Sequence, residues 1–355
     1  MYLSSGLNEF NYLNHLMIVG STTDKKYYIP YISATDVDLT PKEWLFDSFL
    51  LVPEVKNFSL GADINIGTTM SGEGDFYAVP CPNPGNKEAW LTAIDSLICG
   101  ANTISTTIEE LSKIIGKPER KRNLVVMLPY PGVNQCKFGM INGENLNFSV
   151  LGQNLTHATE DRYIACKWFV ETFMAQWKKE AIDNLNLLGF YWPFETVYRG
   201  WNVDDHWLLK EIHRYINVSY NKKLFWIPFW ASYNVHLLDD YQNYYFDAAF
   251  LQPNYMFYEK IKGVEEAAEA AKKRNAGIEM EYFLNLNEPI KVSQERHKRF
   301  REYLNGGVKY GYMDAACAWF VGGKIGEMLK DPIEFEFYQD IVDFVHKRYK
   351  IKNII

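Results

Sequence analysis

The stretch Gly189-Phe-Tyr-Trp-Pro-Phe-Glu195 is an apolar run that ends in a carboxylate, and Gly277-Ile-Glu-Met-Glu281 repeats this pattern further along the chain. Both runs have the composition of a β-strand with an acid at its tip. Carboxylates are rarely buried without a partner, because removing a charge from water is costly, so acids in such runs need an explanation. A pair of catalytic acids supplies one, since cleavage of a glycosidic bond uses two opposed carboxyls, one protonated and one ionised.

Apolar runs of strand length recur along the chain. They lie at residues 16–20, 44–52, 124–129, 187–192, 224–230, 248–251, 278–283 and 310–320. Stretches with helical periodicity separate several of them, at residues 87–98, 161–185, 204–216, 259–274 and 293–304. This alternation is typical of βα units around a parallel sheet. For a chain of 355 residues we therefore predict an α/β fold, a (β/α)8 TIM barrel that forms a single domain over residues 1–355.

Glu195 follows the fourth apolar run. In a (β/α)8 barrel the active site lies at the carboxyl ends of the strands, so an acid in this position is a candidate for catalysis. Pro193 supports the placement, because a proline ends regular strand pairing and releases the chain into a loop. The alternative is a surface glutamate on that loop.

Glu279 and Glu281 share one face of the seventh run, because residues two apart in a strand point the same way. An outward face would pack against helices, where two charges are implausible, so we expect both glutamates in the barrel interior or its mouth. Glu281, nearer the strand end, is the expected catalytic carboxylate. Glu279 would lie one layer deeper, where it could hold a cation or raise the pKa of a neighbour. These two assignments could also be exchanged.

Other polar and aromatic residues near the ends of the runs are candidates for binding a substrate. Amide and indole groups suit sugar hydroxyls and sugar faces. Each has a structural alternative: a tryptophan can pack in the core, an asparagine after a proline can cap a turn, and a strand acid can be structural. The substrate-binding candidates are Asp47, Trp192, Arg199, Trp230, Tyr233, Gln252, Asn254, Glu279 and Asp314.

Composition excludes several other classes of protein. A net charge of −7 opposes nucleic-acid binding, which relies on clustered Lys and Arg. The 5 cysteines are an odd number with no CxxC pair, and the histidines show no metal-ligand spacing. No glycine-rich phosphate loop or dinucleotide fingerprint is present in the sequence. We therefore expect no cofactor and no metal, and a carbohydrate as the partner, in keeping with aromatic residues at 16%.

The sequence contains no apolar stretch long enough to predict a membrane span. The amino terminus lacks a basic segment followed by an apolar one, so the chain as it stands is expected in the cytoplasm. It would be secreted if a leader had been removed. The oligomeric state is left open.

Residues 13–320 resemble the domain-of-unknown-function family 4855, whose members look like TIM-barrel glycosidases. The segments that carry the resemblance are Trp44-Leu-Phe-Asp-Ser-Phe-Leu50, Gly189-Phe-Tyr-Trp-Pro-Phe-Glu195, Phe225-Trp-Ile-Pro-Phe229, Leu251-Gln-Pro-Asn-Tyr255 and Gly277-Ile-Glu-Met-Glu281. Retaining glycosidases of the large TIM-barrel clan place their acid/base after strand four and their nucleophile after strand seven, which implies these roles for Glu195 and Glu281. That clan usually has Asn before the acid/base, whereas this chain has Phe194, so retention or inversion stays open.

Three hypotheses follow. The first is an O-glycosyl hydrolase that uses Glu195 and Glu281. The second is a catalytically silent carbohydrate-binding barrel, in which acids engaged in salt bridges would be expected. The third is a structural or interaction barrel, which predicts no concave aromatic pocket.

Overall fold

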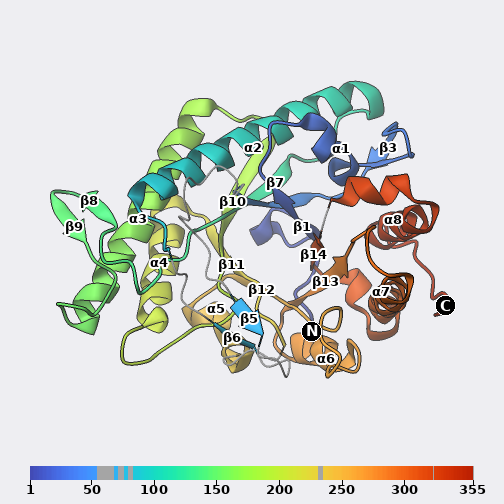
Figure 1. The fold of residues 1–355 in the computed structure, drawn as a ribbon. Coiled ribbons are helices and arrows are strands. Elements are labelled where there is room, and N and C mark those ends of the chain that lie inside the picture. Colours follow the sequence, from blue (N-terminus) through green and yellow to red (C-terminus); the bar gives the residue numbers. More distant parts are fainter. Residues whose placement is uncertain (54–67, 71–75, 79–82, 231–234, 323, 355) are drawn as a thin grey trace.

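Eight parallel strands close into a barrel in the order β1-β14-β13-β12-β11-β10-β7-β4 (Figure 1). The structure, a computed structural model, describes residues 1–53, 68–70, 76–78, 83–230, 235–322 and 324–354. The barrel strands are β1 (His15–Gly20), β4 (Ser48–Val52), β7 (Arg122–Met127), β10 (Leu185–Trp192), β11 (Lys223–Trp226), β12 (Ala248–Leu251), β13 (Gly277–Phe283) and β14 (Cys317–Gly322). The predicted (β/α)8 TIM barrel is therefore confirmed.

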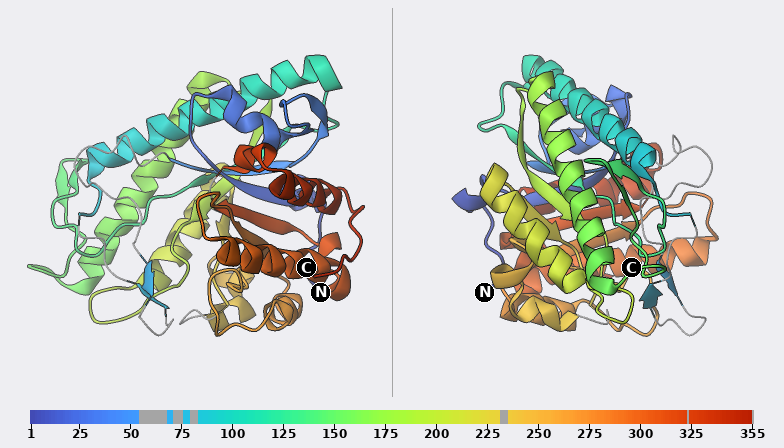
Figure 2. Two further views of the ribbon diagram at one scale, coloured as in Figure 1. Left: turned by 45° about the vertical axis from the view of Figure 1, so that its right-hand side comes forward. Right: turned by 90° about the vertical axis from the view of Figure 1, so that its left-hand side faces the viewer.

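A helix follows every barrel strand along the chain and returns it to the start of the next strand. These helices are α1 (Lys25–Ile32), α2 (Lys87–Ile115), α3 (Leu155–Glu180), α4 (Asp205–Tyr220), α5 (Tyr241–Tyr244), α6 (Glu265–Lys273), α7 (Ile290–Tyr310) and α8 (Pro332–Val345). They surround the strands, and the long helices α2 and α3 lie side by side (Figure 2). Side-chain oxygens of Asn86, Asn154 and Asp204 cap the first turns of α2, α3 and α4.

Short elements decorate the barrel. Three antiparallel hairpins pair β2 (Ser33–Thr35) with β3 (Pro41–Trp44), β5 (Thr68–Met70) with β6 (Phe76–Ala78), and β8 (Gly139–Ile141) with β9 (Glu144–Leu146). The 3-10 helices are η1 (Asn8–Phe10), η4 (Val235–Asp239), η5 (Tyr312–Asp314) and η6 (Ile325–Lys330).

Two of the expected strands start later in the structure than in the sequence analysis. The run 44–52 is divided, because Trp44 ends the hairpin strand β3 and the barrel strand begins at Ser48. The run 310–320 begins with the last turn of α7, and Gly311 at φ +85° then ends that helix in the left-handed region. The chain passes through η5 before β14 starts at Cys317. Apolar composition alone does not separate these pieces.

The stretches that lead to Glu195 and to Glu281 each begin with a glycine, and the reason is steric. At Gly189 a Cβ atom would overlap the backbone of Lys223 on the neighbouring strand β11. At Gly277 it would overlap the ring of Phe250 and the carbonyl oxygen of Ala316. Both glycines thus allow adjacent strands to approach closely at the start of the stretches that lead to Glu195 and Glu281.

The amino end of the barrel is closed by polar side chains and by the first residues of the chain. Asn123 at the start of β7 accepts hydrogen bonds from the side-chain amides of Asn11 (2.7 Å) and Asn186 (3.0 Å). The ring of Phe10 lies 6.1 Å from that of Phe225 beneath the barrel. Access to the barrel interior therefore comes from the carboxyl ends of the strands.

Candidate active site

A cavity of about 440 Å³ opens at the carboxyl ends of the barrel strands. Its wall is aliphatic and aromatic on the side of β1, β4, β7 and β14, and carboxylic on the side of β10 and β13. The lining residues are Ile18, Leu50, Val52, Pro53, Met127, Tyr191, Pro193, Glu195, Gln252, Asn254, Phe257, Tyr258, Glu279, Glu281 and Phe320. Three glutamates thus converge on one apolar cavity, which is the usual form of a small-molecule site.

Strand β13 presents both of its glutamates to this cavity. Glu279 and Glu281 line the wall, while Tyr282 faces the helices. The ring of Tyr282 stacks on that of Phe300 in α7 at 4.5 Å, and its hydroxyl donates to Glu334 in α8 at 2.6 Å. The alternation of β13 therefore sends its acids inward and its other side chains into the layer between barrel and helices.

Glu281 is the most firmly held of the three carboxyls. It is 1% exposed, and its Oε2 accepts a hydrogen bond from the backbone N–H of Asn254 at 2.6 Å. The hydroxyl of Tyr303 in α7 donates to the same oxygen. Burial raises the pKa of Glu281 to about 8, although both hydrogen bonds oppose that shift by favouring the anion.

Glu195 lies at the mouth of the cavity, three residues after the end of β10, and is partly accessible. Burial raises its pKa to about 7, and a hydrogen bond with the side chain of Gln252 acts in the opposite direction. The amide of Gln252 is itself oriented, because its Nε2 donates to the carbonyl oxygen of Ile227 at 2.9 Å. Glu195 can therefore hold a proton near neutral pH and still reach solvent or a bound ligand.

A buried ion pair anchors the loop that carries Glu195. Nη2 of Arg162 lies 2.6 Å from Oδ1 of Asp205, and both side chains are almost fully buried. The hydroxyl of Tyr130 donates to the same carboxylate at 3.0 Å. The ring of Tyr130 packs on Phe194 at 4.9 Å, and the carbonyl oxygen of Phe194 accepts from Nε1 of Trp226 at 2.9 Å. Phe194, which precedes Glu195, is thus held through both its ring and its carbonyl oxygen.

Glu279 lies deepest and differs from the other two acids. It is 3% exposed, and within the described part of the chain no hydrogen bond or ion pair satisfies its carboxyl. Burial, followed by the charges of Glu281 and Glu195, raises its pKa well above the usual range. The empty cavity thus favours the protonated form of the Glu279 carboxyl.

Asn254 is strained in its backbone and unsatisfied in its side chain. Its φ of +58° places it in the left-handed region, which turns the N–H group toward Glu281. Its Nδ2 is buried and finds no hydrogen-bond partner among the residues that the structure describes, although Asn254 lines the cavity. A buried amide without a partner costs on the order of 1–3 kcal/mol, and a ligand in the cavity could recover that cost.

Glu195, Gln252, Asn254, Glu279 and Glu281 are the predicted site residues that the structure brings together around the cavity. Trp192 is not among them. It is fully buried on the outer side of β10, where its ring lies 5.3 Å from that of Tyr130. Its position follows from strand alternation, since Tyr191 takes the inward place.

Two further substrate-binding candidates lie at the carboxyl face but away from the acids. The side chain of Arg199 is 72% exposed and stands 3.9 Å from Asp204. Trp230 lines a separate hollow of about 590 Å³ beside Lys260 and Glu302. The expectation that either contacts the same substrate as Glu195 does not fit these positions. Tyr233 lies outside the described residues.

Asp47 and Asp314 lie at the opposite end of the barrel, which corrects the expectation that they bind substrate. Asp47 immediately precedes β4, where it accepts hydrogen bonds from the backbone and side chain of Asn14 and from Ser48. Asp314 precedes β14, is 73% exposed, and lies 3.3 Å from Nζ of Lys347. Both acids lie within apolar runs, which suggests positions inside strands. Because β4 and β14 start after them, both acids lie at the amino end of the barrel.

The sequence analysis missed several residues of the site. Tyr303 belongs to α7, where helical spacing indicates only packing, and nothing in the sequence connects it with Glu281. Tyr258 and Phe257 come from the segment after β12, and Phe320 comes from β14. The charges of Glu195 and Glu281 contribute, after burial, to a raised pKa of Tyr258, so its hydroxyl lies near both carboxyls.

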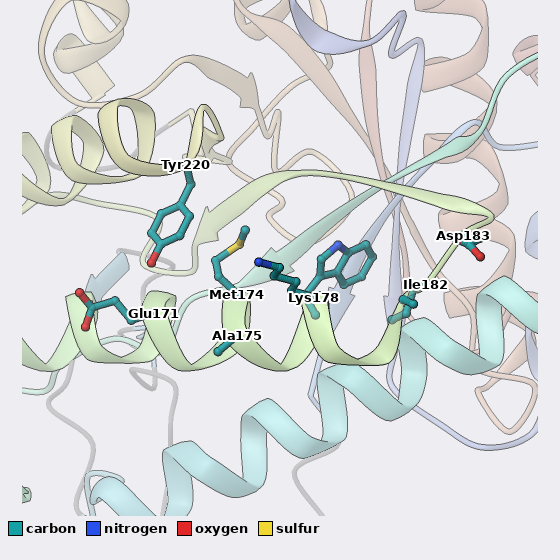
Figure 3. Close-up of a pocket in the computed structure, with 9 residues that line it drawn as sticks. Glu171, Met174, Ala175, Lys178, Ile182, Asp183 and Tyr220 are labelled. Atoms are coloured by element: carbon teal, nitrogen blue, oxygen red, sulfur yellow. The ribbon is translucent and has the colours of Figure 1, made fainter.

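Other hollows of the surface do not contain the acids. The one in Figure 3, of about 590 Å³, lies on the outside between α3 and the end of α4. Glu171, Met174 and Lys178 line it from α3, and Tyr220 faces them. In the described residues no group of three or more His, Cys, Asp and Glu side chains is arranged to hold a metal ion. None of the helices described is both long and apolar enough to span a membrane.

The fold and the site together define a closed (β/α)8 barrel in which three carboxyls converge on one cavity at the carboxyl ends of the strands. The chain belongs to the family described as Domain of unknown function (DUF4855), whose model matches residues 17–341.

Two solved structures and one curated protein are also similar. Xylanase 10B from Thermotoga maritima has a TM-score of 0.47 at 8% identity, covering 98% of this chain and 100% of that one. A mutant tryptophan synthase alpha-subunit from Pyrococcus furiosus has a TM-score of 0.42 at 12% identity, with coverages of 98% and 100%. At identities this low neither structure bears on the chemistry of this chain. A Thermotoga maritima protein named "Putative anti-sigma factor antagonist" is 32% identical over 85 residues, which is 20% of this chain and 75% of that protein.

Proposed function

We propose that the protein is a glycoside hydrolase that cleaves O-glycosidic bonds of an oligo- or polysaccharide. The observation that carries the proposal is the convergence of Glu195 and Glu281, from the fourth and seventh barrel strands, on one aromatic cavity. Raised pKa values suit one member of such a pair to donate a proton near neutral pH.

Glu195 acts as the acid. Its position at the cavity mouth and its partial exposure suit a group that must pass a proton to a leaving-group oxygen and regain it from water. Glu281 acts as the carboxylate at the anomeric carbon, because two donors hold its Oε2 in place. Burial outweighs these donors and raises its pKa to about 8, above that of Glu195, so the active form is the minority state in which Glu195 holds the proton and Glu281 is ionised. The bond from the anomeric carbon to the glycosidic oxygen breaks, and the proton from Glu195 goes to that oxygen.

Glu281 either attacks the anomeric carbon directly or removes a proton from a water that attacks it. In both cases one water is consumed and both carboxyls return to their starting protonation states. The donors around the site, Asn254 Nδ2 and Gln252, suit the recognition of sugar hydroxyls. The rings of Phe257, Tyr258 and Phe320 supply apolar surface for a sugar face.

The alternative of a silent carbohydrate-binding barrel is less well supported. That hypothesis expects the acids to be engaged in salt bridges, and within the described residues neither Glu195 nor Glu281 pairs with a cation. A purely structural barrel expects no aromatic cavity at this end, whereas one of about 440 Å³ is present.

The test is to separate turnover from binding. Glu195→Gln removes the transferable proton and keeps the shape of the side chain, so it should abolish most turnover and leave saccharide binding intact. Calorimetric titration with the best substrate of the wild-type protein measures the binding. If Glu195→Gln binds the saccharide more weakly but still cleaves the bound saccharide at the wild-type rate, the role given to Glu195 is contradicted.

A further inference from the structure

The cavity holds one more carboxyl than glycosidic cleavage requires. Glu279 faces the same space as Glu195 and Glu281, is 3% exposed, and makes no hydrogen bond or ion pair within the described part of the chain. A buried carboxyl without a partner is unfavourable, and such groups normally occur where a ligand or a partner satisfies them.

The described part of the cavity wall supplies no positive charge to balance these acids. Among the described residues that line the cavity there is no Lys, Arg or His, and the remaining polar groups are amides and tyrosine hydroxyls. With three carboxyls that can ionise and no fixed cation on the described part of its wall, the cavity favours a ligand that brings its own positive charge over a neutral one.

The unsatisfied donor of Asn254 lies in the same cavity and is an independent sign of a polar ligand. Its buried Nδ2 requires an acceptor, such as a sugar hydroxyl or ring oxygen. The ligand should therefore combine an acceptor for Asn254, an apolar face for the aromatic rings and a cationic group for Glu279.

We infer that the sugar bound in this cavity is a hexosamine with a free amino group, whose ammonium pairs with Glu279. This inference rests on the proposed glycosidase function and names its substrate class. A charge-assisted hydrogen bond in a water-poor cavity contributes more than one between neutral groups. Glu279 is a binding residue in this account, distinct from Glu195 and Glu281, which act on the glycosidic bond.

Binding of the amine should be accompanied by the release of a proton from Glu279. Burial and the two neighbouring carboxyls keep the pKa of Glu279 well above its usual range in the empty cavity, which favours the protonated form of its carboxyl. An ammonium placed beside it lowers that pKa and drives the proton into solution. Binding of a free-amine sugar should thus release about one proton, whereas binding of an uncharged sugar should not.

The experiment compares matched oligosaccharides of glucosamine and galactosamine, their N-acetylated forms, and the corresponding glucose and galactose oligomers. Calorimetric titration of the Glu195→Gln variant, which should be unable to turn them over, gives the affinity of each. Repeating it in buffers of different ionisation enthalpy gives the protons released. We expect at least about a tenfold preference for the free amine over its N-acetylated form, as a charge-assisted hydrogen bond allows.

Glu279→Gln, added to the same background, should reduce that preference to near unity and abolish proton release. The substitution keeps the shape of the side chain and breaks no hydrogen bond or ion pair of the described residues, so its melting curve should match that of the parent. Glu259→Gln is the control, because it makes the same substitution at an exposed glutamate outside the cavity. If no oligosaccharide with a free amine binds better than its N-acetylated or uncharged counterpart, the inference is overturned. Uniformly weak binding of all the oligosaccharides counts as this outcome.

The two proposals fail in different ways. If the wild-type protein cleaves neutral or acetylated oligomers through Glu195 and gains nothing from a free amine, the substrate inference fails and the glycosidase function stands. If free-amine sugars bind with a preference that depends on Glu279 and no oligomer or polysaccharide is cleaved, the glycosidase function fails and the charge inference stands.

Discussion

The hydroxyl of Tyr303 in the outer helix α7 donates a hydrogen bond to Glu281 on the barrel strand β13. The hydroxyl oxygen of Tyr303 also accepts hydrogen bonds from the backbone N–H groups of Tyr255 (3.1 Å) and Met256 (3.3 Å). A residue of the helical layer thus orients the proposed catalytic carboxylate and the backbone just after Asn254 at once. The geometry of the site depends on how α7 packs against the barrel.

Tyr303→Phe should impair catalysis through Glu281. Losing a donor that favours the anion raises the pKa of Glu281. Because the pKa of Glu281, about 8, already lies above that of Glu195, about 7, the maximum of kcat/KM should fall and the alkaline limb of its pH profile should move to higher pH. The two backbone N–H groups lose their acceptor, which should cost about 1–3 kcal/mol in the free energy of unfolding. Initial rates across a pH series and chemical denaturation measure both effects.

A matched control for Tyr303 is Tyr338→Phe. Tyr338 is also buried, and its hydroxyl accepts from the backbone N–H of Thr35 at 3.1 Å far from the cavity. This variant should lose a similar amount of stability without moving the pH profile. A profile that shifts equally in both variants would show that the effect of Tyr303 is only structural.

The pH profile of the wild-type protein should be bell-shaped with its maximum near neutrality. Burial raises the pKa of Glu195 to about 7 and that of Glu281 to about 8, and the apparent values of kcat/KM belong to the pair. Activity falls as pH rises because the acid loses its proton, and falls as pH drops because the carboxylate gains one. A maximum near the ordinary carboxyl value of 4.5 would contradict the burial of both groups.

Asn254→Gly should weaken binding without harming the fold. Glycine accepts the φ of +58° and keeps the N–H that donates to Glu281, while the side-chain donor to the cavity is lost. The loss of one hydrogen bond to a neutral sugar corresponds to a rise in KM of roughly threefold to tenfold. Asn254→Ala removes the same donor but strains the backbone, so a larger fall in stability should appear in Ala than in Gly. Equal KM values for Gly and wild type would remove Asn254 from the binding site.

Asp205→Asn should destabilise the protein and loosen the Glu195 loop. Arg162 would become a buried cation without a carboxylate, which costs on the order of 3–5 kcal/mol. Arg199→Ala is the contrast, because its pair with Asp204 is exposed and should contribute no more than about 1 kcal/mol. Denaturant unfolding of both variants, with rates alongside, tests this. Comparable losses in the two would contradict the anchoring role of the buried pair.

The barrel could be predicted from the sequence because its signals are local. Alternating apolar runs and helical stretches identify βα units, and the alternation in Gly277–Phe283 places Glu279 and Glu281 on one face. The boundaries before β4 and β14 could not be predicted, because the hairpin and the helix end that precede them are also rich in apolar residues. Because the predicted strands begin a few residues too early, Asp47 and Asp314 are expected at the carboxyl end of the barrel, whereas they lie at its amino end.

The remaining errors concern contacts that no local pattern encodes. Trp192 and Tyr191 are adjacent aromatic residues, and only the register of β10 decides that the tyrosine faces the cavity. Tyr303 reaches Glu281 across the helix layer, from a position where spacing indicates packing alone. Such long-range pairs depend on how helices dock on the barrel, which periodicity does not specify.

The central claim is that Glu195 and Glu281 form a catalytic pair. Its most direct test is a screen for released reducing sugar across plant, microbial, host and amino-sugar polysaccharides, with wild type, Glu195→Gln, Glu281→Gln and the amino-end variant Asp47→Asn. We expect release by wild type and by Asp47→Asn, and its loss in both glutamate variants. Release that survives in Glu195→Gln and Glu281→Gln would contradict the account.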